Sequence, residues 1–163
     1  MFKKSIFAFF FFIPQADALD LQEHYCMTEA IYYEARNQPL IGQLAVGIVI
    51  RNRVKFQKWP DSVCGVVHEG YYYQGFPLMD QCQFSYWCDG KPEEPEDEKA
   101  WVTAEGIAFL ILTENLTIQG MENATHYHAK SVKPNWIVKF DMCGIIKDHI
   151  FYCPKTSRIS ISY

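Results

Sequence analysis

Glu34 is the residue of this 163-residue chain whose type and position most directly suggest acid catalysis. Met27, Ala30, Ile31 and Glu34 are spaced i, i+3, i+4 and i+7, so a helix over 21–36 would place them on one face. A carboxyl group on an otherwise apolar face is costly to ionise, so its pKa should rise, and it can then protonate a glycosidic oxygen at neutral pH. The periodicity alone favours a plainer interpretation, a structural ion pair with one of three arginines: Arg36, Arg51 or Arg53.

His126 and His128 form a second candidate site, because residues i and i+2 of a strand point to the same side. Together with His149 or a carboxylate they would make the ligand set of a zinc hydrolase. A His-x-His pair is a weak signal, and by itself it favours a metal-free role as polar lining of a cleft.

Three further features carry less chemistry. Ser85 lacks the sequence context of a nucleophile elbow, which argues against a serine hydrolase. Asp89 lies between an aromatic loop and Gly90, so it is a turn residue or a ligand of substrate hydroxyls, and the turn is favoured. The acidic run 93–98 is typical of a solvated surface.

The elements that must position these side chains are predicted to be helices first and strands later. Helices are expected over 21–36 and 41–54, separated by a break at Pro39, and over 96–116, with Pro95 and an acidic first turn at its start and Gly120 at its end. Residues 71–89 are expected to be irregular and held by cross-links. Short strands are expected over 124–129, 145–152 and 159–163. One α+β domain with a single core is the predicted architecture.

Residues 1–18 have the pattern of a secretory signal peptide, with two lysines, an apolar run and a small-x-small cleavage site ending at Ala18. The expected mature domain is therefore 19–163, in an exported location, and no later run is apolar and long enough to span a membrane. The formal net charge of −4, without a basic stripe, argues against nucleic acid as a partner.

All six cysteines lie after residue 18, and an even count in an exported chain favours a disulfide framework. Sequence cannot choose among the 15 possible pairings, although Cys82 and Cys88 are close enough to close a small loop. The chain has no C-x-x-C pair, which argues against structural zinc.

Several ordered blocks resemble the SleB-type cell wall hydrolases, also called spore cortex-lytic enzymes. They are AIYYEAR (30–36), GQLAV (42–46), RNRV (51–54), VCGVV (63–67), CQFSYWCDG (82–90), ATHYHA (124–129) with Val132 and Trp136, and HIFY (149–152). The resemblance extends over about 23–152. Multiple blocks in the same order are far more specific than any single motif.

This resemblance implies a cleft like that of lysozymes and lytic transglycosylases, acting on peptidoglycan glycan strands as a monomer without metal or cofactor. The family's single catalytic glutamate falls on Glu34. The implied reaction breaks the β-1,4 bond between N-acetylmuramic acid and N-acetylglucosamine. Candidate walls for the sugar rings are Phe84, Tyr86, Trp87, Tyr127 and Trp136, and candidate hydrogen-bond partners are Ser85, Asp89, His126 and His128.

The sequence departs from the family where Asn37-Gln38 replaces the common Gly-Glu pair, which removes a carboxylate near Glu34. Three alternatives remain open at this stage. They are a muramidase, a zinc amidase using His126 and His128, and a non-catalytic module that binds the wall.

Overall fold

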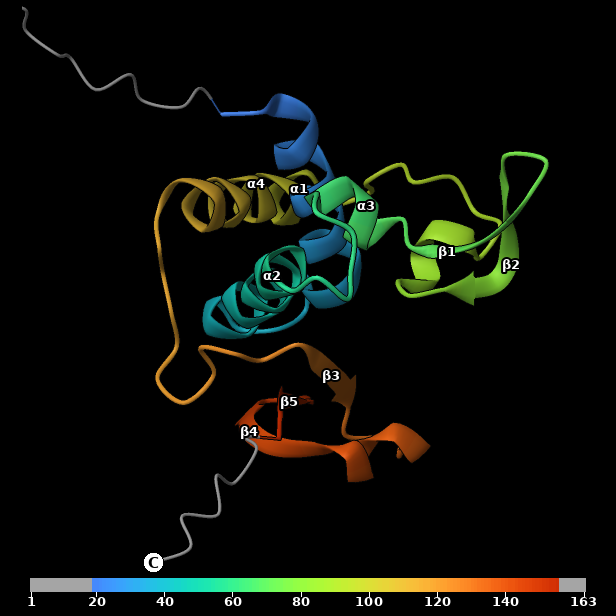
Figure 1. Cartoon of the computed structure of the whole chain (residues 1–163). Helices are drawn as coiled ribbons and strands as arrows, with labels where there is room; N and C mark the ends of the chain where they lie inside the picture. The colour runs from blue at the N-terminus through green and yellow to red at the C-terminus, as the bar shows by residue number, and fades with distance from the viewer. Residues whose placement is uncertain (1–18, 156–163) are drawn as a thin grey trace, which may run out of the picture.

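The helical layer begins with two antiparallel helices. The computed structural model describes residues 19–155, and its first elements are α1 (Leu21–Ala35) and α2 (Leu40–Lys55) (Figure 1). Asp20 caps α1 by accepting hydrogen bonds from the backbone N–H groups of the first turn. Pro39 has no N–H to place inside the preceding helix and stands at the start of α2. Both predicted helices are confirmed to within one residue at each end.

Two more helices complete this layer, α3 (Val63–Val67) and α4 (Glu98–Thr113). Fully buried apolar side chains from α1, α2 and α4 form the core, among them Met27, Ile31, Ile48 and Ile111. The prediction of a helix over 96–116 was too long at both ends. Asp97 caps α4 by accepting from Ala100 N, and the backbone is already extended at residue 114. Gly120 belongs to a later turn with positive φ, not to the helix end.

Residues 70–88 are more regular than predicted. They form a hairpin of β1 (Gly70–Tyr73) and β2 (Phe76–Cys82), followed by the 3₁₀ turn η1 (Ser85–Cys88). Gln74 and Gly75 both have positive φ, which suits a two-residue hairpin turn whose twist matches the strands. The expectation of an irregular segment was wrong because this turn signal lies in backbone conformation and not in hydrophobic periodicity.

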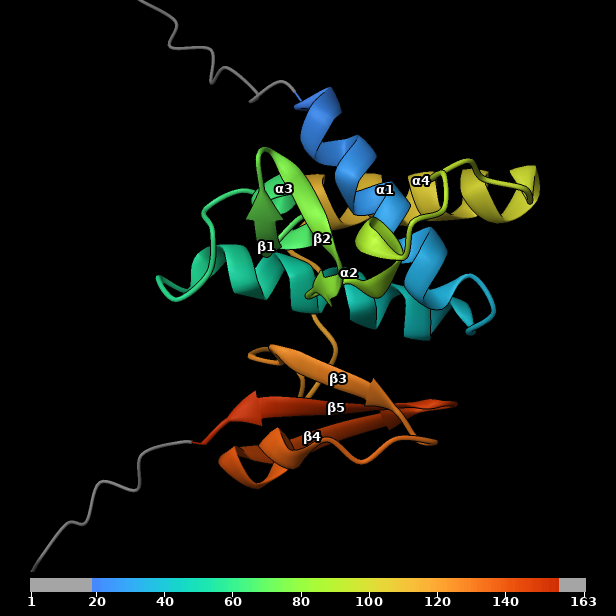
Figure 2. The ribbon, with the colours of Figure 1, turned by 90° about the vertical axis from the view of Figure 1, so that its right-hand side faces the viewer.

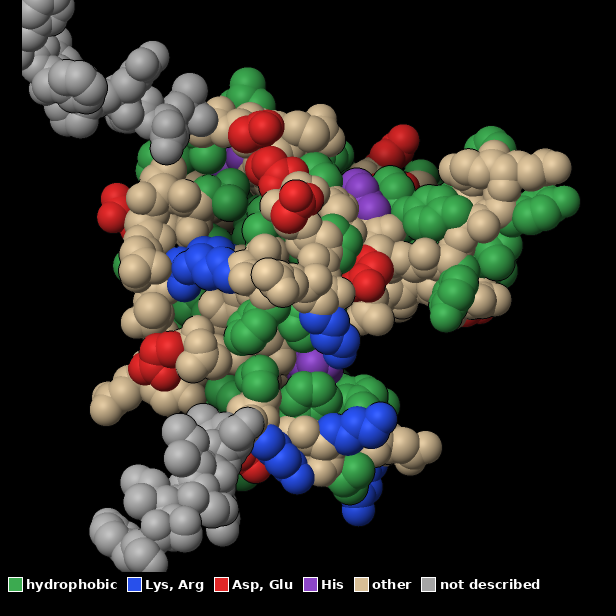
Figure 3. All heavy atoms as spheres, in the orientation of Figure 1, with side chains coloured by type: hydrophobic (Ala, Val, Ile, Leu, Met, Phe, Trp, Pro, Cys, Tyr) green, Lys and Arg blue, Asp and Glu red, His purple; other side chains and the backbone are tan. Residues whose placement is uncertain are grey.

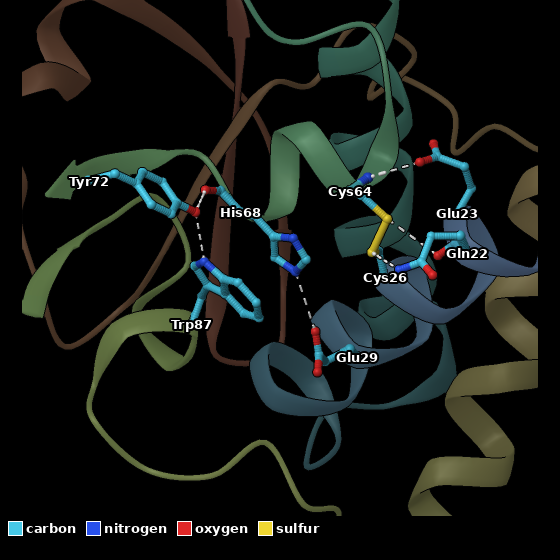
Figure 4. A network of polar contacts seen from close by, with 8 residues as sticks. All are labelled: Gln22, Glu23, Cys26, Glu29, Cys64, His68, Tyr72 and Trp87. Carbon is cyan, nitrogen blue, oxygen red and sulfur yellow. Dashed lines mark hydrogen bonds and ion pairs between the residues drawn. A yellow bond between two sulfur atoms is a disulfide. The ribbon is translucent and has the colours of Figure 1, made fainter. Parts of the chain in front are cut away.

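Side chains fasten the base of the hairpin to the helical layer (Figure 4). The Tyr72 hydroxyl donates to the His68 carbonyl oxygen at 2.6 Å and accepts from Trp87 Nε1 at 2.9 Å. The His68 ring stacks on Trp87, with centroids 3.6 Å apart, and its Nε2 lies 3.7 Å from the buried carboxylate of Glu29 on α1. Trp87 is therefore used in packing the hairpin.

The second layer is an antiparallel sheet in the order β3–β5–β4. Its strands are β3 (His126–Ala129), β4 (Phe140–Ile146) and β5 (His149–Pro154), and the short helix η2 (Asn135–Lys139) precedes β4. The predicted strand over 145–152 is in fact two strands. Lys147 adopts a positive φ of 44° and, with Asp148, turns the chain back on itself. The strand expected over 159–163 and the signal peptide expected over 1–18 lie outside the described residues.

The sheet lies against one side of the helical layer, with β3 nearest to α2 (Figure 2). Adjacent residues of α2 donate to the chain entering β3, Asn52 Nδ2 to the Ala124 carbonyl at 2.9 Å and Arg53 Nε to the Thr125 carbonyl at 2.8 Å. Gln38 is buried and exchanges hydrogen bonds with Asp148 in the β4–β5 turn. The amide that departs from the family pattern thus joins the two layers.

The expected disulfide framework is confirmed, since all six cysteines pair. Cys82–Cys88 closes the small loop suggested by spacing, and the other bridges are Cys26–Cys64 and Cys143–Cys153. Each bridge lies within one part of the fold: α1 to α3, β2 to η1, or β4 to β5. Across residues 19–155, no helix is both long and apolar enough to cross a membrane.

Candidate active site

Glu34 lies in the last turn of α1, where the helical layer faces the sheet. It lines a pocket of about 280 Å³ between the two layers, called here the Glu34 pocket. Phe84, 2% exposed, lies just before η1 and forms part of the wall. Four further predicted residues reach this pocket from the β3 and η2 regions: His126, Tyr127, His128 and Trp136.

The Glu34 carboxyl is held by a single side-chain hydrogen bond. Tyr127 OH donates to Glu34 Oε2 at 2.9 Å. Burial raises the pKa of Glu34 above its ordinary value of 4.5, and the Tyr127 hydrogen bond and the charge of Arg53 oppose that rise without cancelling it. None of the ion pairs among residues 19–155 includes Glu34, so the structural ion pair favoured by periodicity was wrong.

Arg53 is the basic residue of the pocket, and its guanidinium is almost fully buried. Its Nε donates to the Thr125 carbonyl, and its Cζ lies 5.5 Å from the Phe84 ring centroid and 5.7 Å from that of Trp59. These contacts fix the charge near Glu34 without a direct bond to it. The charge of Arg53 therefore favours the ionised form of Glu34.

The two histidines of β3 face the same side, as predicted, and Trp136 packs against both. The ring centroids of His126 and His128 lie 5.2 and 5.7 Å from that of Trp136. His128 Nδ1 contacts the Ala129 carbonyl at 2.9 Å and its Nε2 contacts Tyr152 OH at 3.0 Å, so both ring nitrogens already have partners. Burial, with the charges of Arg53 and Lys58, lowers the pKa of His126 to about 4. His126 is therefore neutral near pH 7.

This geometry does not favour the zinc hydrolase interpretation. Within residues 19–155, no three His, Cys, Asp or Glu side chains come together as a metal site. Both ring nitrogens of His128, the atoms that would bind a metal, contact protein atoms instead. Nδ1 of His126 lies 2.9 Å from Thr125 Oγ1. The histidines instead hold the Trp136 ring at the pocket wall, where an indole can stack on a sugar ring.

Three predicted substrate-binding residues lie elsewhere. Ser85, Tyr86 and Asp89 line a neighbouring pocket and not the Glu34 pocket. The reason is η1, because the tight 3₁₀ turn after Phe84 carries the next side chains to a different face. The block CQFSYWCDG (82–90) is continuous in sequence, but its side chains line two different pockets.

Sequence reasoning missed three polar residues of the Glu34 pocket as site residues: Arg53, Gln83 and His149. Arg53 was considered as an ion-pair partner of Glu34, whereas its Nε donates to the carbonyl of Thr125, 72 residues away in the chain. His149 was considered only as a third metal ligand. It is 8% exposed, its Nδ1 is buried without a partner in the described part of the chain, and burial lowers its pKa. An unpaired ring nitrogen is suited to bind a sugar hydroxyl.

Tyr127→Phe is expected to move the alkaline limb of the kcat/KM profile to higher pH. The lost hydrogen bond favours the ionised carboxylate, so its removal raises the pKa of Glu34, and a general acid then stays protonated to higher pH. Loss of orientation should lower kcat by roughly tenfold. Rates measured across the pH range on solubilised glycan would check this, and a limb that stays in place or moves downward would contradict it.

The profile of the cell wall hydrolase family matches residues 37–152 of this chain. The chain belongs to the cell wall hydrolase family. The match begins three residues after Glu34 and includes every other residue of the Glu34 pocket. This membership confirms the resemblance inferred from the ordered blocks.

Two solved structures share this fold. The catalytic domain of the SleB protein of Bacillus cereus matches with a TM-score of 0.61 and 24% identity, covering 83% of this chain and 93% of that domain. The catalytic domain of the germination-specific lytic transglycosylase SleB of Bacillus anthracis matches with a TM-score of 0.62 and 25% identity, covering 83% and 98%. The predicted α+β architecture, with helices first and antiparallel strands later, is confirmed.

Curated relatives match over a shorter segment. The spore cortex-lytic enzyme of Halalkalibacterium halodurans is 49% identical over 43 residues, which is 26% of this chain and 13% of the relative. That of Bacillus subtilis is 44% identical over 43 residues, or 26% and 14%. The aligned segment therefore spans only a small part of these relatives' length.

Proposed function

We propose that this cell wall hydrolase cleaves the β-1,4 bond between N-acetylmuramic acid and N-acetylglucosamine as a lytic transglycosylase, with Glu34 as its catalytic residue. The observation that supports this most strongly is the composition of the Glu34 pocket. Among the described residues that line it, Glu34 is the only acid, and its pKa is raised by burial. Glycosidases that activate water or form a glycosyl-enzyme ordinarily place a second carboxylate about 5–9.5 Å away.

The reaction needs one group that gives a proton and then takes one. Glu34 protonates the bridging oxygen, and the C1–O bond of muramic acid breaks as the sugar's own acetamido oxygen bonds to C1. The ionised Glu34 next accepts the proton of the C6 hydroxyl. O6 then bonds to C1, displaces the acetamido oxygen and closes a 1,6-anhydro ring. Glu34 ends protonated, and no water is consumed.

The surrounding residues suit these steps. Tyr127 and Arg53 favour the carboxylate form that exists between the two proton transfers, while burial favours the acid form that begins and ends the cycle. The Trp136 ring provides a stacking surface. The similar structure from Bacillus anthracis is that of a lytic transglycosylase. We also propose export, supported by the signal-peptide pattern of residues 1–18 and by the location of the substrate.

Mass spectrometry of fragments released from purified sacculi by 19–163 tests this proposal. Anhydro-muramic products, lighter by one water than the hydrolytic ones, would support it. Reducing-end products would replace it with a muramidase, and free stem peptides with an amidase. Sacculi that bind the protein without releasing fragments would indicate the non-catalytic module.

Chelation is expected to leave the release rate unchanged. Neither His126 nor His128 belongs to a metal-ligand cluster within residues 19–155, and both contact protein atoms. Release would be measured in EDTA and after dialysis against metal-free buffer, with a known zinc amidase as the positive control. A large loss of activity that zinc restores would refute this expectation and favour the amidase.

A further inference from the structure

A second pocket adjoins the Glu34 pocket and is larger, at about 430 Å³. It is called here the Arg36 pocket. The two pockets share the same chain segments, since Tyr33 lines the second and Glu34 the first, and Ser85 lines the second and Phe84 the first. Adjacent residues of α1, and adjacent residues of the chain entering η1, therefore line the two pockets.

The Arg36 pocket holds polar atoms that lack partners. Tyr86 is 8% exposed, and its hydroxyl is buried without a hydrogen-bond partner in the described part of the chain. The Tyr33 hydroxyl is also buried and unpaired there, and the two rings stack with centroids 4.7 Å apart. Buried hydroxyls without partners are uncommon and costly, so these two are suited to a ligand that brings amide groups.

Charge distinguishes this pocket from the first. No carboxylate among residues 19–155 lies within ion-pair distance of Arg36, whose guanidinium lies 4.8 Å from the Tyr32 ring centroid. Lys91 is paired with Asp89 at 3.1 Å, and three more acids line the pocket: Glu93, Glu94 and Glu96. A free guanidinium beside a group of carboxylates matches a ligand that carries both an anion and a cation.

We infer that the Arg36 pocket binds the stem peptide attached to the muramic acid being cleaved. This inference rests on the proposed function. In the intact strand the lactyl carboxyl of muramic acid is bound to the stem as an amide, so only the stem offers a free carboxylate to Arg36 and the ammonium group of its diamino acid to the acidic residues. The stem starts at C3 of the sugar whose C1 reacts, and an extended peptide advances about 3.3 Å per residue, so its first residues span the adjoining pocket. Amides of the stem reach the Tyr33 and Tyr86 hydroxyls.

Paired substrates test the inference. The rate of cleavage is measured on glycan strands that keep their stem peptides and on strands stripped of them by an amidase, which leaves only the lactyl carboxylate on each muramic acid. The wild-type protein is expected to cleave the stem-bearing strands about tenfold faster. Arg36→Gln should bring the ratio of the two rates toward one. Lys55→Gln removes an exposed charge that lines neither pocket, and it should keep the wild-type ratio.

The outcomes separate the inference from the proposed function. A wild-type ratio of one, or a ratio that Arg36→Gln leaves unchanged, would overturn the stem-peptide site while leaving glycan cleavage intact. A variant that slows both substrates equally would indicate a sugar subsite and also overturn it. If the protein cleaves neither substrate, stem-peptide binding is measured directly, by calorimetric titration of soluble disaccharide-tetrapeptide into the Glu34→Gln protein. Binding weakened about tenfold by adding Tyr86→Phe or Arg36→Gln would support the site, and equal affinities would reject it.

Discussion

Glu34→Gln is expected to lower the rate of fragment release by at least about a thousandfold. The amide keeps the shape of the side chain but neither donates the catalytic proton nor accepts one afterwards, and general acid–base groups contribute about 10²–10⁴ each. Release from sacculi by single-turnover mass spectrometry would measure the loss. The matched control is Glu29→Gln, a buried acid of the same helix that lines neither pocket. Its rate should stay within about threefold of wild type.

The same substitution is expected to change how the stability of the folded protein depends on pH. Burial raises the folded-state pKa of Glu34 above 4.5, so the folded protein loses stability as pH rises from 4.5 through that higher value. The glutamine does not titrate. The thermal midpoint of Glu34→Gln relative to wild type should therefore be higher at neutral pH than at a pH below 4.5. A catalytic loss accompanied by a lower midpoint at neutral pH would indicate misfolding instead.

Removing the Cys26–Cys64 bridge is expected to be the most destabilising change outside the pockets. Its ends are 38 residues apart, and the entropy of the loop it closes corresponds to about 4 kcal/mol of the free energy of unfolding. A Cys26→Ala, Cys64→Ala double variant should therefore melt about 10 °C lower. The bridge ties α1 to α3, the helix that directly precedes His68 at the base of the hairpin.

The Cys82–Cys88 bridge is the matched comparison. Its ends are six residues apart, so the same relation gives about 2 kcal/mol for its removal. Calorimetric melting of both double variants, each against wild type, would rank them. If removal of Cys82–Cys88 lowers the stability more than removal of Cys26–Cys64, native-state packing and not loop entropy determines how much these bridges stabilise the fold.

Helical periodicity was enough to place Glu34 correctly. The spacing of Met27, Ala30 and Ile31 marks the buried face of α1, and the catalytic candidate follows at the next position of that face. Local patterning also gave β3 and the shared side of its two histidines. These features depend on residues near one another in the chain, and such local patterns can be recognised in a single sequence.

Features decided by distant contacts were not predictable in the same way. The burial of Arg53 depends on the Thr125 carbonyl, and the docking of Gln38 depends on Asp148, 110 residues away. The two turns that were not predicted place Gln74 and Lys147 at positive φ, a conformation that neither residue type indicates. Division of one motif block between two pockets likewise follows from the geometry of η1.

The placement of the disulfides affects which part of the fold opens first in denaturant. Every disulfide lies within one part of the fold, while the helices and the sheet are joined by hydrogen bonds, by buried apolar side chains such as Phe151, and by the single chain segment between α4 and β3. We therefore expect the helical layer and the sheet to separate from each other before either one unfolds, as a sub-global opening. In mild urea, activity should then vanish while helical circular dichroism persists. Amides at the interface between the helical layer and the sheet should exchange with deuterium sooner than those inside α1 or β5.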